Sequence, residues 1–309
     1  MTATSIPRTS FPRPTAVSGR DELHPDCSNC FALCCTAFGF SRSADFAIDK
    51  PAGTPCPNLA ADFSCGIHDR LRPRGFRGCT VFDCFGAGQA VSQGLFDGVS
   101  WRDKPDSKYA MFPAFKIVRQ LHEMLWYLAE AQERAFDPET GTAVQDLRLA
   151  IGNAAKGPLP GLLALDVGTL HHGVRQVLVE VSEEVRAAYF AAGDELDERL
   201  QPAADLAGSD LRTLRFCGAD LRGACLIGAD LRGIDLTAVD LLGADLRDAR
   251  LEGADLSRAL YLTQPQLNSA RGNPETRLPG GLEVPGHWRS DQGPGDRRPG
   301  DRRLGDRRL

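Results

Sequence analysis

The cysteines are the residues of this chain best suited to chemistry, because eight of the ten lie close together near its start. The stretch CSNCFALCC ends on two adjacent thiols, Cys34 and Cys35. Thiolates are strong ligands of zinc and iron, and one structural zinc site uses four ligands. Eight thiols therefore indicate two ions, or one polynuclear centre with spare thiols. The candidate ligands are Cys27, Cys30, Cys34, Cys35, Cys56, Cys65, Cys79 and Cys84.

A disulfide framework is the main alternative for such a cluster. The opening stretch MTATSIPRTSFPRPTAVSGR lacks the apolar segment of a secretory signal, and no apolar run reaches the roughly 18 residues that span a bilayer. We therefore expect a cytoplasmic protein without a membrane segment. In a reducing compartment, clustered cysteines serve metal or redox sites more often than disulfides. Export by a route without such a signal keeps disulfides open.

Two details bear on the individual ligands. Adjacent side chains in extended backbone point to opposite faces, so Cys34 and Cys35 are not expected to bind the same ion. One of them serves a different metal position or is not a ligand. His68 follows Cys65 in the sequence CGIH, and its imidazole is either a further ligand or an ordinary polar neighbour.

This spacing resembles a Cys-rich family described as zinc- or iron-chelating and sometimes as related to iron–sulfur oxidoreductases. That family opens with a CxxCxxCC motif and continues with a later cysteine, a C-x-I-Y/H motif, an Arg-Pro segment and C-x4-C. The gap between Cys30 and Cys34 is three residues here, which loosens the assignment of individual ligands. The resemblance implies zinc or iron, including an iron–sulfur cluster, and all-thiolate ligation leaves the metal open. The matching residues are Cys27, Cys30, Cys34, Cys35, Cys56, Cys65, Ile67, His68, Cys79 and Cys84.

The elements that must hold these thiols follow from composition. Residues 20–88 are rich in Gly and Pro and poor in apolar periodicity, so we expect a domain that needs the metal as a staple. Residues 89–200 carry apolar residues at helical spacing and predict a small helical domain. Its stripes include Ile117, Leu121, Met124, Leu125 and Leu128 after a first-turn Pro113, then Val144, Leu147 and Ile151, then Val174, Val177, Leu178, Val181, Val185 and Ala188.

Residues 204–263 repeat with a period of five, as in ADLRG and ADLSR, over twelve units. The central residue is Leu in all units but two, which have Phe216 and Tyr261, and a small or branched residue stands two positions earlier. A fixed short period predicts a solenoid, and Cys217 and Cys225 fall on its outward positions. The pattern resembles the pentapeptide-repeat family. The resemblance implies a right-handed quadrilateral β-helix of about three coils, with the central residues pointing inward.

The ends of the chain differ in character. Thr263 and Gln266 have capping-box spacing before a helix that would close the repeat region, with the cap at residues 264–288. Residues 1–19 and the stretch 289–309 read as disordered tails, the second one basic. The predicted fold is thus multidomain: a tail at 1–19, a Cys-rich metal-binding domain at 20–88, helices at 89–200, a β-helix at 201–263, a cap at 264–288, and a basic tail at 289–309.

Function is predicted as binding rather than catalysis. The net charge of −5 argues against nucleic acid, except for weak contact through the basic tail with Arg297, Arg298, Arg302, Arg303, Arg307 and Arg308. No acid–base pair, activated nucleophile or phosphate loop is recognisable, so an enzyme is the less favoured class. We predict a non-enzymatic metal-binding protein that acts as an interaction module for a protein partner.

Two alternatives remain. Some pentapeptide-repeat proteins mimic DNA, bind type II topoisomerases and confer antibiotic resistance, but three coils of about 4.8 Å match only roughly four base pairs. The other alternative is an iron–sulfur redox protein.

Overall fold

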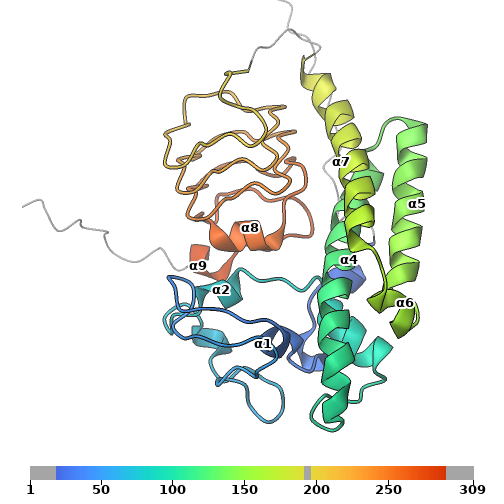
Figure 1. Cartoon of the computed structure of the whole chain (residues 1–309). Coiled ribbons are helices and arrows are strands. Elements are labelled where there is room, and N and C mark those ends of the chain that lie inside the picture. The colour runs from blue at the N-terminus through green and yellow to red at the C-terminus, as the bar shows by residue number, and fades with distance from the viewer. Residues whose placement is uncertain (1–18, 191–195, 290–309) are drawn as a thin grey trace, which may run out of the picture.

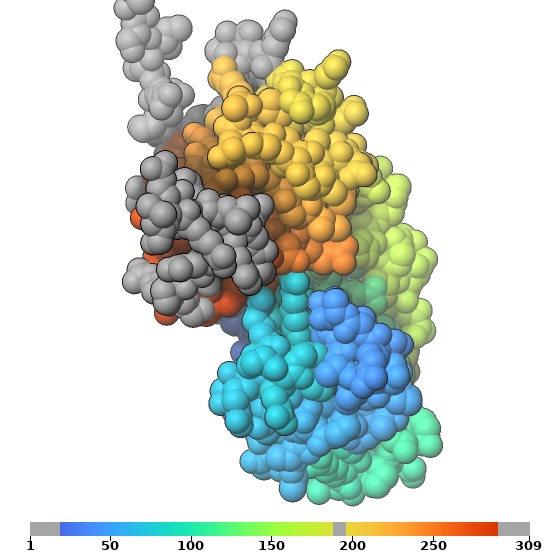
Figure 2. Space-filling view, turned by 90° about the vertical axis from the view of Figure 1, so that its left-hand side faces the viewer, coloured from blue at the N-terminus to red at the C-terminus, as the bar shows by residue number. Residues whose placement is uncertain are grey.

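The computed structural model describes residues 19–190 and 196–289. Figure 1 shows three parts: a bundle of long helices, the repeat region beside it, and a loop-rich head, residues 20–88, that lies below the repeat region. In the view of Figure 2, the blue and cyan N-terminal residues form a separate lobe beneath the yellow and orange repeats. The two predicted tails lie outside the described residues, apart from Gly19 and Arg289.

Helices provide all the regular structure of the described residues. The α-helices are α1 (Leu33–Ala37), α2 (Arg77–Thr80), α3 (Ala87–Gln89), α4 (Lys108–Arg134), α5 (Pro138–Ala155), α6 (Leu159–Leu163), α7 (Val167–Phe190), α8 (Gln264–Ser269) and α9 (Gly286–Arg289). Four short 3-10 helices cover Asp21–Leu23, Cys27–Asn29, His68–Arg70 and Pro105–Ser107, and a π-helix covers Ala90–Leu95.

Helix α4 is the central element of the bundle and contacts α5, α6, α7, α1 and α3. The predicted apolar stripe is present, since Leu121, Met124 and Leu128 are buried. The helix begins earlier than expected, so that Pro113 lies inside it and not in the first turn. The other two predicted stripes lie on α5 and α7, with the predicted residues Val144 and Val181 fully buried.

The predicted quadrilateral β-helix is wrong, because the described residues contain no strand or sheet. Each five-residue unit contributes a turn and at most one bridging residue, so the hydrogen bonds never extend into a ladder of consecutive residues. Isolated parallel bridges join residues 20 positions apart, for example Asp210 with Asp230 and Asp220 with Asp240. The repeat region is therefore a stack of turns linked by single bridges.

The interior of the repeat region follows the sequence pattern closely. The predicted central residues Leu221, Leu226 and Phe216 are almost completely buried in one hydrophobic cluster. Ala219 and Ala224, two positions before the two leucines, are fully buried in it, and Leu214, two positions before Phe216, packs against it partly buried. Tyr261 departs from the pattern, because it packs into the cluster of the helical bundle while Leu262 joins the repeat cluster. Its backbone has a positive φ of 58°, and its hydroxyl donates to the Leu178 carbonyl of α7 at 3.0 Å. The last unit thus anchors the repeats to the bundle.

The end of the repeat region is closed by residues after Thr263. The predicted capping box begins helix α8, with the Gln266 side chain accepting from the Thr263 backbone N–H at 2.9 Å. Trp288 on α9 is 2% exposed and donates from Nε1 to the Ala270 carbonyl at 3.1 Å. A Cβ on Gly272 would lie 2.6 Å from the Trp288 ring, so this contact requires glycine. The sequence pattern did not reveal Trp288 as a core residue.

The head has a very small apolar core of its own, made of Ile67, Leu71 and Phe76. It is held to the rest of the molecule by apolar packing, with Leu33 and Ala37 of α1 buried in one cluster with α4, and by charged side chains. Arg77 pairs with Asp248 of the repeat region at 3.0 Å. The predicted domain boundaries stay a prediction, since one hydrophobic cluster contains α1, the bundle helices and the last repeat unit.

Candidate metal centre

Four of the eight thiols gather around one side of the head: Cys35 lies in α1, Cys79 in α2, and Cys56 and Cys65 in the loops between these helices. Burial raises the pKa of Cys79 to about 12, and the nearby thiols of Cys35, Cys56 and Cys65 raise it further. The pKa of Cys65 is also raised, by burial first and then by Cys35 and Cys56. The backbone N–H of Cys56 donates to the Cys35 carbonyl at 3.0 Å. We call Cys35, Cys56, Cys65 and Cys79 the Cys35 group.

The other four thiols gather on the side of the head that faces α3. Burial raises the pKa of Cys84 to about 11, and Asp83 and Cys30 contribute in the same direction. Cys30 in turn lies near Cys27, and Cys34 lies near both Cys30 and Cys84. We call Cys27, Cys30, Cys34 and Cys84 the Cys34 group.

The two groups meet at the adjacent pair, whose sulfur atoms are 3.8 Å apart. Both cysteines lie in helix α1, so the expectation of extended backbone at this point is wrong. On a helix, adjacent side chains point about 100° apart, yet these two sulfurs lie as close as two thiolates on one tetrahedral zinc, about 3.8 Å for Zn–S bonds of about 2.3 Å. The hydrogen bond from Cys34 lowers the pKa of Cys35 to about 7, and the Lys50 ammonium acts in the same direction. Burial and then the charge of Cys35 raise the pKa of Cys27, so the two groups are close neighbours.

Backbone and small residues that the sequence reasoning missed support the Cys34 group. The Cys30 sulfur accepts hydrogen bonds from two backbone N–H groups of the following turn and from the Ser92 hydroxyl, which favour its thiolate. The Cys84 sulfur accepts from the N–H groups of Gly86 and Gly88. A Cβ on Gly88 would lie 2.7 Å from the Cys30 sulfur and 3.8 Å from the Cys84 sulfur. The sequence signal that could have identified Gly88 is its position four residues after the candidate ligand Cys84.

Lys50 is the second feature that sequence reasoning missed, and it belongs to the Cys35 group. Its side chain is buried, with the whole residue 3% exposed. Its ammonium donates to the carbonyls of Thr54 at 2.8 Å, Pro51 at 3.3 Å, Thr36 at 3.4 Å and Phe38. Burial lowers the Lys50 pKa, and the thiols around it oppose that shift.

The arrangement fits a thiolate-bound metal in the kind and number of its donors. Each group offers four sulfurs, the number that a structural zinc or an iron–sulfur site uses. As the side chains are placed, no set of three or more His, Cys, Asp or Glu in the described residues could hold a metal ion. His68 is exposed in its 3-10 helix, and Cys217 and Cys225 lie far along the chain in the repeat region.

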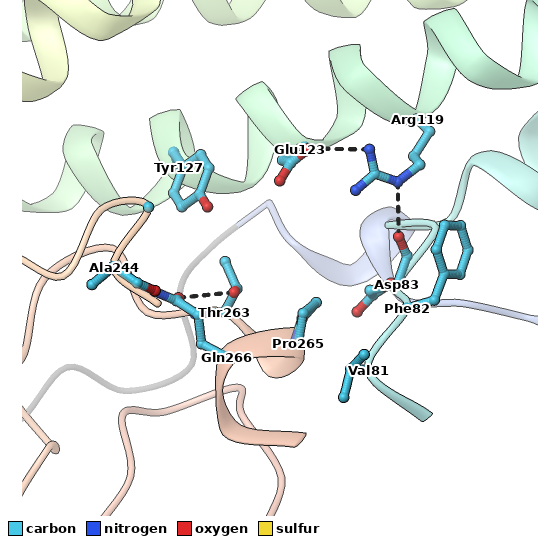
Figure 3. Close-up of a pocket in the computed structure, with 11 residues that line it drawn as sticks. Val81, Phe82, Asp83, Arg119, Glu123, Tyr127, Ala244, Thr263, Pro265 and Gln266 are labelled. Carbon is cyan, nitrogen blue, oxygen red and sulfur yellow. Dashed lines mark hydrogen bonds and ion pairs between the residues drawn. The ribbon is translucent and has the colours of Figure 1, made fainter. Parts of the chain in front are cut away.

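A pocket of about 260 Å³ lies where the head, α4 and α8 meet. Figure 3 shows Val81, Phe82 and Asp83 on one side of it, opposite Tyr127. Arg119 of α4 donates from Nε to the Asp83 carbonyl at 3.1 Å. Residues 81–83 connect Cys79 of one thiol group to Cys84 of the other, so the pocket wall depends on the position of both groups.

Family comparison agrees with the repeat pattern. A model of the pentapeptide repeats matches residues 203–237 and 224–260, with eight copies. The chain is 48% identical over 268 residues to the uncharacterized protein YybG of Bacillus subtilis (strain 168) and covers 95% of that protein and 87% of itself. It therefore belongs to the same family as YybG, and it is a pentapeptide-repeat protein.

One similar solved structure is a pentapeptide repeat protein from the thylakoid lumen of Arabidopsis thaliana. The match is 29% identical, covers 29% of this chain and 59% of that chain, and has a TM-score of 0.19. Similarity at that level carries no argument about the overall fold. The resemblance of the head to the zinc- or iron-chelating family has no counterpart in these matches. Across the described residues, no helix combines the length and apolar character needed to cross a bilayer.

Proposed function

We propose that this protein is a non-enzymatic, metal-binding pentapeptide-repeat protein in which two thiolate-bound ions hold the head against the helical bundle and the repeats. The observation that supports the proposal is that eight thiols lie near one another in the head and shift one another's pKa in two overlapping sets, which meet at Cys34 and Cys35. One ion per group would satisfy four ligands each.

The burial of the head supports this role. Ile67, Leu71 and Phe76 form its own apolar cluster with partly buried neighbours such as Phe40 and Phe46, while α1 packs into the cluster of the helical bundle. The loops after α1 therefore have a small core of their own, which a bound ion would reinforce. Burial and mutual repulsion raise the pKa of most of the thiols, so that thiolates here need a cation. A divalent ion supplies that charge and links turns that are distant in sequence.

Elemental analysis of the full chain, purified anaerobically, together with a visible spectrum tests the proposal. We expect about two zinc ions per chain and no colour, or iron with broad absorbance near 400 nm if the centre is an iron–sulfur cluster. Cys34→Ser and Cys35→Ser should each lose one ion, while Cys225→Ser, outside the head, should lose none. A chain that binds no metal in any preparation would refute the proposal.

The proposed role of the repeat region is to present a charged surface to a protein partner. Its acidic side chains are largely paired within the chain, as in Asp210 with Arg212 at 2.7 Å and Asp230 with Arg232 at 2.6 Å. Such a surface lacks the uniform negative charge that imitation of DNA requires. A supercoiling assay with a type II topoisomerase should accordingly show no effect at micromolar protein.

A further inference from the structure

The pocket where the head, α4 and α8 meet has one wall of polar and charged side chains. Arg119, Glu123 and Tyr127 follow one another at intervals of four residues, so they share one face of α4. They line the pocket together with Asp83 of the head, across from Pro265 of α8 (Figure 3). We call these four side chains the charged wall. The volume of about 260 Å³ lies just below the roughly 300 to 1,000 Å³ of sites for drug-sized ligands, so the pocket suits a smaller molecule.

The opposite wall, formed by α8 and the repeat region, has already used its polar side chain. The Gln266 side-chain oxygen accepts from the Thr263 N–H and from the Thr263 hydroxyl, both at 2.9 Å. Its Nε2 donates to the carbonyls of Leu241 at 2.9 Å and Ala244 at 3.0 Å. Pro265 has no N–H to donate. A ligand would therefore meet mainly apolar surface on this side.

The charged wall carries a negative charge that the chain does not balance. Arg119 pairs with Glu123 at 3.3 Å and donates from Nε to the backbone carbonyl of Asp83 at 3.1 Å. One carboxylate oxygen of Asp83 accepts from the Phe85 N–H at 2.7 Å. Within the described ranges, no ion pair joins the Asp83 carboxylate to a Lys, Arg or His side chain. Two carboxylates facing one guanidinium leave one negative charge uncompensated.

The hydroxyl of Tyr127 is a second unused group on this wall. The ring packs edge-on against Tyr261, with 6.2 Å between the ring centroids, but no hydrogen bond joins the Tyr127 hydroxyl to any other described residue. Burial raises the pKa of Tyr127, so the hydroxyl stays protonated and can donate. Hydroxyls in such partly buried positions are hydrogen-bonded to water or to a ligand. The charged wall thus offers both free acceptors and a free donor.

We propose that this pocket binds a small primary amine that carries a hydrogen-bond acceptor on a short carbon chain. The ammonium pairs with the Asp83 carboxylate, the chain packs against Phe82 and Pro265, and the acceptor takes the hydrogen bond of the Tyr127 hydroxyl. An anion of the same size is repelled by the uncompensated carboxylate. The proposal goes beyond metal binding and concerns a different ligand. Because the lining residues come from the head, the bundle and the cap, the amine binds only when all three are assembled.

Titration calorimetry of the full chain with linear butanolamine, which has a terminal amine and a terminal hydroxyl, tests the proposal. Butanediol is its neutral analogue and hydroxybutyrate its acidic one. We expect butanolamine to bind at least about tenfold more tightly than butanediol, because it alone makes a charged hydrogen bond, and hydroxybutyrate not to bind. Equal binding of butanolamine and butanediol, binding of hydroxybutyrate, or no binding of butanolamine would overturn the proposal.

Two variants place the amine in the pocket. Asp83→Asn keeps an acceptor for the Phe85 N–H but removes the charge, and it should weaken butanolamine binding about 10- to 100-fold. Tyr127→Phe keeps the ring and should weaken binding about 2- to 10-fold. The exposed Asp69 of the head gives the matched control, and Asp69→Asn should bind butanolamine like the wild type.

Thermal melts of each variant establish that it is folded, and the metal content is measured on the same samples. Unchanged butanolamine binding in both Asp83→Asn and Tyr127→Phe would overturn the proposal. A wild type that binds butanolamine but no metal would refute only the proposed function, and one that binds metal but no butanolamine would refute only the amine site.

Discussion

The repeat region and the head build their interiors by different means. The repeat region buries a leucine or phenylalanine and a small residue in nearly every unit, and each buried side chain contributes about 1.5 to 3 kcal/mol. The head buries three apolar side chains in its own cluster, packs α1 into the bundle, and carries eight thiols and a buried lysine. A short sequence period thus builds a continuous apolar core, whereas the loops of the head bury few apolar side chains, and the proposed metal would add to that small core.

Metal removal should give the largest difference in stability between the head and the repeat region. Structural zinc contributes about 10 to 16 kcal/mol in small thiolate domains, so a chelator under reducing conditions should unfold residues 20–88 and leave the repeat region folded. Hydrogen exchange resolved by peptide measures this, with fast exchange expected around Cys35 and Cys84 and slow exchange kept around Leu226. Equal protection of the head with and without chelator would show that it does not need the metal.

Shortening a repeat leucine should have the converse effect. Leu226 is completely buried, and Leu226→Ala should lower the free energy of unfolding by about 2 to 5 kcal/mol without changing the metal content. Denaturant melts measure the change in stability, and elemental analysis measures the metal content. Leu149, which is 55% exposed on α5, provides the control: Leu149→Ala should change stability by about 0.5 kcal/mol or less. A loss of metal in Leu226→Ala would mean that the head depends on the repeats.

A buried carboxyl on the side of the repeats that faces α7 should make stability depend on pH. Burial raises the pKa of Asp240 to about 6, with a smaller contribution from Asp220, against the opposing effect of a Ser182 hydrogen bond and of Arg222. One carboxylate oxygen of Asp240 has no hydrogen-bond partner. The folded state therefore binds a proton more tightly than the unfolded chain, whose Asp titrates near 3.8.

The stabilisation from that proton is complete below about pH 4 and is lost as the pH rises through 6, at a cost of about 2 to 3 kcal/mol. Asp240→Asn should flatten this part of the pH–stability profile, measured by denaturant melts from pH 4 to 7. Asp210 is exposed, and Arg212 lowers its pKa to about 2, so Asp210→Asn should leave the slope in this window unchanged. A slope that persists in Asp240→Asn would contradict the assignment.

Replacing Gly88 should have the smallest effect on stability of these changes. The effect should be confined to the Cys34 group. In an open helix position, replacing glycine by alanine stabilises by about 0.5 to 1 kcal/mol. At Gly88 the new methyl group would lie 2.7 Å from the Cys30 sulfur, so Gly88→Ala should instead destabilise by about 1 to 3 kcal/mol and loosen only the Cys34 group. Gly94, with nothing within 4 Å of its Cβ position, is the matched control. Native mass spectrometry should show one weakened ion in Gly88→Ala and none in Gly94→Ala.

The sequence predicted the helices and the repeat interior because these depend on local patterns, and the eight thiols stay predicted metal ligands. Leu121 and Leu226 are buried as their periods indicate. It failed on the predicted β-helix, because five-residue units with single bridges form no strand in the described residues. It also failed on Tyr261, whose central position gave no sign that the last unit turns outward to the bundle.

The sequence by itself determined which residues are apolar at a fixed period and which segment holds the thiols, because both are properties of neighbouring positions. Only the tertiary structure decided which thiols are neighbours, that the two sets meet at Cys34 and Cys35, and that Lys50 and Gly88 lie beside them. Those neighbours come from segments up to about sixty residues apart, and their meeting is set by backbone hydrogen bonds and packing that no local pattern records.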